Sequence, residues 1–100
     1  MNQELTLRNR LEQISGVSIR GRYENTKVYI RGERSFQANR GKQPLFVVDG
    51  RKMGRSFYRI ASIFTPEQIV SVEVLSGAGA NLYGSEGGAG VIVIKTNRGN

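Results

Sequence analysis

The feature that most constrains this fold is a pair of continuous apolar runs in the second half of the chain. Residues 45–48 read LFVV and residues 91–94 read VIVI. Strands that are apolar at every position are expected where both faces of a sheet are covered. Between them, residues 70–74 (VSVEV) alternate as in a strand with one buried face. The second half is therefore predicted to form a sheet with material packed on both sides.

The first half predicts smaller elements. Leu7, Leu11 and Ile14 recur at helical spacing, with Thr6 as the expected N-cap. The remaining elements predicted are half-buried strands at 17–19 and 28–30, a short helix at 58–64 and a one-turn helix starting at Thr65, whose capping box Gln68 completes.

The strand at 72–74, a short helix near Gly77 and the strand at 91–96 suggest a β-α-β unit. A right-handed parallel crossover is the default for such a unit, although about fifteen intervening residues is near the lower limit. We therefore predict a single small α+β domain over residues 1–100. It has a mixed sheet of about four strands, two or three short helices and glycine-rich connections.

The composition removes much of the chemistry available to enzymes. The 100 residues contain no cysteine and no histidine, so thiolate ligands, cysteine nucleophiles and the commonest general base are excluded. No pair of carboxylates lies close in the sequence, and the first ten residues lack the apolar core of a signal peptide. We expect no catalytic residue, no metal site and no cofactor.

The charge is unevenly distributed. Residues 1–60 hold 13 Lys/Arg and 5 Asp/Glu, a net charge of +8, whereas residues 61–100 hold 2 and 3, a net charge of −1. One interpretation is a nucleic-acid-binding module, since Tyr23, Tyr29 and Phe36 are interleaved with the basic residues. The other is a solvated basic surface. No nucleic-acid-binding motif is present. Clustering of the arginines on one face of the folded domain would favour the nucleic-acid interpretation, and scattering would weaken it.

The glycine-rich segment 77–90 raises the alternative of a nucleotide-binding loop, because it follows a strand. Leu82 stands where the third fingerprint glycine is required, and no phosphate-binding GK[ST] follows. The structural interpretation is that Gly and Ala residues let a short helix pack close to the sheet. Gly84 and Gly90 then turn the chain into the last strand.

Two further loops are predicted. Asp49 and Gly50 form a strong tight-turn dipeptide after the first apolar run. Residues 33–43 are polar, and loops of this kind carry recognition as often as they serve as plain connectors.

The order of these pieces is more specific than any one of them. Along the chain run IRG at 30–32, VVDG at 47–50, TPEQI at 65–69, VEVL at 72–75, YGS at 83–85 and GVIVIKT at 90–96. In this order the chain resembles the plug domain of TonB-dependent outer-membrane receptors, especially the SusC/RagA-like branch of Bacteroidetes. The resemblance covers nearly the whole chain.

The resemblance implies a location in the Gram-negative cell envelope and a β-barrel partner whose pore the plug closes. TonB would act only through a segment that this sequence lacks, and no nucleic acid is expected as a partner. The barrel would lie in cis if the chain is part of a receptor, and in trans if it is a free-standing plug-like envelope protein.

The resemblance also assigns roles to residues. The barrel-facing or partner-binding residues expected are Arg20, Arg31 and Arg51, which would meet carboxylates on the barrel wall. The expected ligand-side loop carries Arg34, Phe36, Asn39 and Arg40. The structural turns expected are at Asp49, Gly50, Tyr83, Gly84 and Gly90.

Overall fold

The computed structural model describes residues 3–30 and 43–97. Short 3₁₀ helices are labelled η. In chain order the elements are α1 (Gln3–Glu12), β1 (Val17–Arg20), η1 (Tyr23–Asn25), β2 (Lys27–Ile30), β3 (Leu45–Val48), β4 (Arg51–Lys52), α3 (Phe57–Ile63), η2 (Pro66–Gln68), β5 (Ile69–Leu75), η3 (Gly77–Gly87) and β6 (Val91–Thr96). The α+β class and the four-stranded mixed sheet are confirmed.

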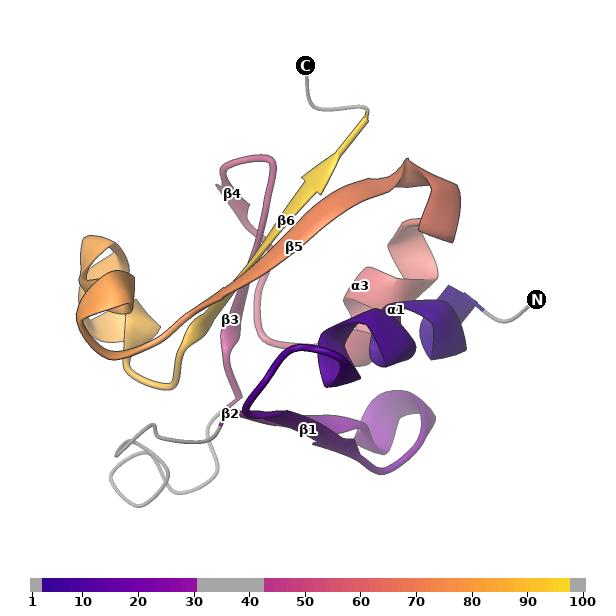
Figure 1. Cartoon of the computed structure of the whole chain (residues 1–100), viewed down its shortest axis with the longest axis horizontal. Helices are drawn as coiled ribbons and strands as arrows, with labels where there is room; N and C mark the ends of the chain where they lie inside the picture. Colours follow the sequence, from indigo (N-terminus) through magenta and orange to yellow (C-terminus); the bar gives the residue numbers. More distant parts are fainter. Residues whose placement is uncertain (1–2, 31–42, 98–100) are drawn as a thin grey trace.

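The strands form two separate sheets (Figure 1). β1 and β2 pair antiparallel as a hairpin, and the larger sheet has the order β4-β3-β6-β5. β6 pairs parallel with β3 and antiparallel with β5. The predicted parallel crossover between β5 and β6 is therefore wrong. The intervening residues fold into η3 at one end of the sheet, and an antiparallel pair needs only a connection between adjacent strand ends.

One face of the larger sheet carries the main core. α1, α3 and the β1–β2 hairpin cover it, as Figure 1 shows on the lower right. Phe46 and Ile92 from the sheet meet Phe57 and Ile60 of α3 and Leu11 of α1, all almost completely buried. The apolar residues at helical spacing in the first helix therefore face the core, as the sequence predicts. The helix begins at Gln3 rather than after Thr6.

η3 covers one end of the opposite face. Ala80 of η3 packs against Leu45, Val47 and Val91, with Tyr83 and Val93 partly buried around them. This second, smaller cluster is why β3 and the first part of β6 are buried on both faces. The continuous apolar runs are explained by this two-sided cover.

β5 is less buried than its valines predict. Val70 is 61% exposed, and the pairing register shifts between Ile69 and Ser71, so Val70 falls out of the alternation. Val72 and Val74 pack against the main core but are only partly buried, because β5 lies at the edge of the sheet. Edge position, which the sequence does not show, sets their exposure.

Local capping follows the sequence in part. The Ser56 hydroxyl accepts a hydrogen bond from the backbone N–H of Arg59 at the start of α3. At η2 the Gln68 side chain accepts from the backbone N–H of Thr65, which is one half of the predicted capping box. Among the described helices, none is both long enough and apolar enough to span a bilayer.

Replacing Ile92 with Ala should lower the free energy of unfolding by about 2–5 kcal/mol, because it leaves a cavity in a fully buried site. Val70→Ala in the neighbouring strand is the matched control and should cost under about 0.5 kcal/mol, since Val70 is exposed. Urea denaturation measures both. Equal costs would contradict the burial assigned to β6.

Candidate functional surfaces

Much of the basic first half is used inside the fold. Arg8 donates to the backbone carbonyls of Ile19 and Gly21, and its Nε lies 3.7 Å from Oε2 of Glu12. Arg10 donates to the carbonyl of Ile69 at 2.9 Å. These guanidinium groups hold α1 to β1 and to the start of β5, so their charges do not form a recognition surface.

A second group of basic residues anchors η3. Arg55 donates to the backbone carbonyls of Gln43 and Glu86, at 2.7 and 2.9 Å, and Lys52 forms an ion pair with the Glu86 carboxylate. Because Lys52 is the cross-strand partner of Val47, its side chain lies on the face that η3 covers. No sequence pattern indicates a role for Arg8, Arg10, Arg55 or Lys52, and only their three-dimensional neighbours reveal one.

The expected barrel-facing residues fall on different elements. Arg20 is exposed at the end of β1, and Arg51 is exposed on β4 of the other sheet. Figure 1 places β1 and β4 well apart. Arg31 lies outside the described residues. The structure therefore does not bring Arg20 and Arg51 into one patch. Such scattering counts against the nucleic-acid interpretation, which required clustering on one face.

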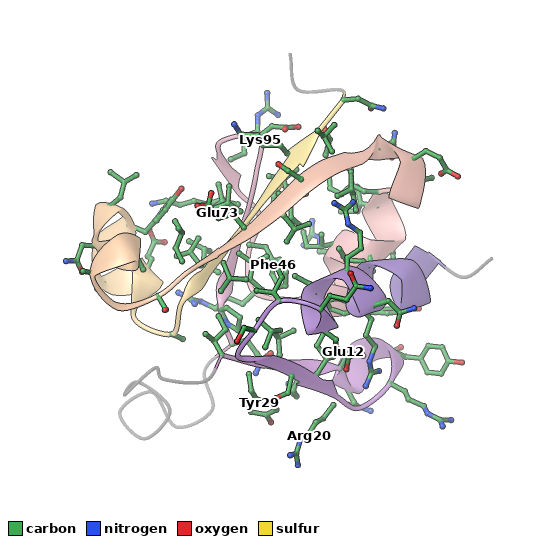
Figure 2. All side chains as sticks on the ribbon, in the orientation of Figure 1. Glu12, Arg20, Tyr29, Phe46, Glu73 and Lys95 are labelled. Atoms are coloured by element: carbon green, nitrogen blue, oxygen red, sulfur yellow. The ribbon has the colours of Figure 1, made fainter. Side chains whose placement is uncertain are left out.

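Arg20 nevertheless has a basic neighbour. It is the cross-strand partner of Lys27, and the next outward pair along the hairpin is Ser18 with Tyr29. Arg20 and Lys27 are both exposed, and Figure 2 shows Arg20 and Tyr29 directed away from the body of the molecule. We call Ser18, Arg20, Lys27 and Tyr29 the hairpin face. Like charges directly opposite each other are unfavourable, so this face suits an anionic partner.

The expected ligand-side loop, with Arg34, Phe36, Asn39 and Arg40, lies outside the described residues. Its assignment stays a prediction from the sequence. Within the described ranges, no three metal-ligating side chains come together.

The glycine-rich segment is closely packed around Ala80, Gly87 and Gly90, and most of its other residues are exposed. Gly84 and Gly90 have φ of 60° and 95°, which glycine adopts at little cost. A Cβ on Gly87 would lie 2.5 Å from the Ala80 carbonyl oxygen, so η3 closes tightly upon itself. Ala80 is buried against the sheet and Tyr83 packs beside it. This close packing counts against a phosphate-binding nest of backbone N–H groups.

Asp49 has a role beyond its turn. Asp49 and Gly50 have φ of 51° and 85°, the left-handed pair of a type I′ hairpin turn between β3 and β4. The Asp49 carboxylate also accepts hydrogen bonds from the backbone N–H and the hydroxyl of Thr96, at 2.9 and 2.6 Å. It therefore ties this turn to the end of β6. Because the two residues are 47 positions apart in the sequence, no sequence signal could have shown this contact.

Comparison with known proteins decides the family. Residues 1–91 match the family described as the TonB-dependent receptor plug domain. The chain belongs to this family. Plug domains are parts of outer-membrane receptors of Gram-negative bacteria, which agrees with the envelope location implied by the motif order.

Three curated relatives illustrate the range of the match. The chain is 36% identical over 98 residues to the vitamin B12 transporter BtuB of Vibrio vulnificus, covering 94% of this chain. It is 38% identical over 76 residues to TonB-dependent receptor P39 of Formosa agariphila, covering 75% of this chain. It is 42% identical over 74 residues to receptor P3 of the same species, covering 73% of this chain. The two Formosa proteins represent the predicted Bacteroidetes branch.

The plug domain spans only a small part of these relatives. The matched regions are 15% of the Vibrio transporter and 7% and 6% of the two Formosa receptors. By their names the relatives are transporters and receptors rather than enzymes.

Gly87→Ala should destabilise the domain by about 1–3 kcal/mol, because the new methyl group meets the Ala80 backbone inside η3. Gly79→Ala, in the same segment, meets no atom within 4 Å and is the matched control. Thermal unfolding followed by circular dichroism compares the two. A fully stable Gly87→Ala variant would contradict the close packing of η3.

Asp49→Asn should cost about 1–3 kcal/mol of stability, because asparagine tolerates the left-handed turn but loses the charge-assisted bonds to Thr96. Glu24→Gln, an exposed carboxylate change on η1, serves as the control. Chemical denaturation gives both values. If Asp49→Asn lowers the stability no more than Glu24→Gln does, the contact between the turn and β6 contributes no stability and the prediction is wrong.

Proposed function

We propose that this plug domain closes the pore of an outer-membrane β-barrel transporter and contributes to ligand uptake. The observation that carries the proposal is the family match over residues 1–91. The barrel would belong to the same polypeptide or to a second envelope protein. Large outer-membrane transporters have barrels of about 22 strands whose lumen is plugged.

The architecture supports a blocking role. The larger sheet is covered by α1, α3 and the hairpin on one face, and η3 covers one end of the other, so packed side chains lie on both sides of β3 and β6. Its principal extents are 36 × 30 × 21 Å. We expect a body of this size to obstruct the lumen of a large barrel.

We further propose that exposed cations seat the domain against carboxylates of the barrel wall. Arg20 and Lys27 on the hairpin face provide one contact, and Arg51 on β4 provides another. A wall surrounds its plug, so cations on separate sheets suit it better than they suit a single polyanion strand. The assignment extends to Arg31 from the sequence alone. Inside a barrel these charges lose solvent and need partners.

Two parts of the proposal rest mainly on the sequence. The loop with Arg34, Phe36, Asn39 and Arg40 is proposed to face the imported ligand. We also infer that the domain acts by contact and not by catalysis, since its relatives are transporters and receptors and the chain lacks cysteine and histidine.

A chimera tests the function. In the Vibrio vulnificus vitamin B12 transporter, this chain would replace the resident plug, and the conductance of the purified protein would be recorded in planar bilayers. The chimera should be closed, whereas the same barrel without a plug should conduct. A folded chimera that conducts like the empty barrel would refute pore closure.

The seating contact is tested in the same chimera. Arg20→Gln combined with Lys27→Gln should change the stability of the 100-residue chain by under about 0.5 kcal/mol, because both residues are exposed. In the chimera the double variant should raise the frequency of open events. Arg59→Gln, an exposed arginine on α3, is the control for loss of charge. Equal gating in both would disprove the role of the hairpin face.

A further inference from the structure

The two sheets present four outer edges, and three of them are partly blocked or very short. Arg8 caps the β1 edge by donating to the carbonyl of Ile19. The Gln43 side chain caps the β2 edge by accepting from the N–H of Val28. β4 is only two residues long, which is itself a common protection of a sheet edge. β5, with seven residues, is the fourth edge.

The hydrogen-bond ladder shows which β5 groups point outward. The N–H groups of Leu45 and Asp49 donate to the carbonyls of Gly90 and Ile94, so alternate residues of β6 face β3. Val91, Val93 and Lys95 therefore face β5 and bond to their partners there, Leu75, Glu73 and Ser71. The N–H and C=O groups of Val72 and Val74 consequently point away from the sheet.

This outward edge is open at one end only. Arg10 donates a hydrogen bond to the Ile69 carbonyl. The register shift between Ile69 and Ser71 also disrupts the start of the strand. From Val72 to Leu75 no such device is present within residues 3–30 and 43–97. In the same ranges, no hydrogen bond is made to the outward groups of Val72 and Val74.

The side chains around the open edge specify what would fit there. Val72 and Val74 lie on the main-core face, where Ile14 and Ile30 are also only partly buried. Glu73 is exposed on the opposite face (Figure 2). Among the described residues, Glu73 forms no ion pair within 4 Å. An added antiparallel strand would place one residue directly opposite Glu73 in a non-hydrogen-bonded pair, where side chains come closest.

We propose that the Val72–Leu75 edge of β5 binds an extended segment of a partner protein by antiparallel strand addition. The segment carries a Lys or Arg opposite Glu73 and apolar residues on either side of that cation. Backbone hydrogen bonds to Val72 and Val74 supply the attachment, and the cation sets the register. This interaction goes beyond pore closure and does not depend on it.

A second copy of this chain is a poor occupant. In the symmetric register that uses Val72 and Val74 of both copies, Glu73 would stand opposite Glu73 of the other copy. Like charges directly opposite are destabilising. The same carboxylate that favours a basic partner strand thus discourages self-pairing at the edge.

The test uses the 100-residue chain and a fluorescently labelled synthetic peptide in which a central lysine is flanked by valines and then threonines. A matched peptide has glutamate at the centre. Fluorescence anisotropy should show binding of the lysine peptide that is at least about fivefold tighter than that of the glutamate peptide. Failure to bind the lysine peptide would overturn the proposal, whatever the chimera shows about the pore.

Two variants locate the binding. Val74→Pro removes an outward N–H that the β5–β6 ladder does not use, so an edge strand tolerates it. It should abolish peptide binding, while Val74→Ala, which keeps the N–H, should retain it. Unchanged binding by Val74→Pro would overturn the proposal.

Glu73→Lys keeps the test decisive if the proline variant unfolds. This reversal of charge should exchange the preference between the two peptides, and an unchanged preference would exclude the assigned register. Sedimentation equilibrium of the chain alone should show a monomer. A dimer that Val74→Pro disrupts would show instead that the edge is used for self-association.

Discussion

The parallel pairing of β3 with β6 is the contact on which the rest of this domain depends. It joins strands more than forty residues apart and provides a platform that is apolar on both sides. The helices and the hairpin pack on one face because Phe46, Ile92 and Ile94 point there. η3 packs on the other face, where Leu45, Val47 and Val91 point. Either layer without the platform would have no apolar surface to cover.

Charged side chains act mainly as connectors between these layers. Arg8 and Arg10 hold α1 to β1 and β5, whereas Arg55 and Lys52 hold the β4 region to η3. The positive charge that remains exposed is spread over separate elements. A basic composition thus indicates less about partners than it first suggests, because several guanidinium groups donate to backbone carbonyls of this same domain.

The treatment of sheet edges connects the fold to its proposed partners. Side-chain contacts block part of the β1 and β2 edges, β4 is only two residues long, and β5 remains accessible beyond its first residues. Natural sheets block free edges because an open edge pairs with any extended chain. An edge left open beside a single exposed carboxylate therefore has the properties of a selective binding site.

The sequence alone determined the elements whose cause is local. The apolar runs of β3 and β6, the caps of α3 and η2 and the Asp49-Gly50 turn depend on residues within a few positions of each other. The order of these motifs was also enough to indicate the plug family before any comparison.

Tertiary structure decided everything that depends on distant neighbours. The direction of β5 against β6, the exposure of Val70 and the separation of Arg20 from Arg51 follow from which strands become neighbours. The tie between Asp49 and Thr96 and the carbonyls that Arg8, Arg10 and Arg55 reach join residues far apart in the chain. Local periodicity carries no information about such pairs, because it records which face of an element is buried but not what buries it.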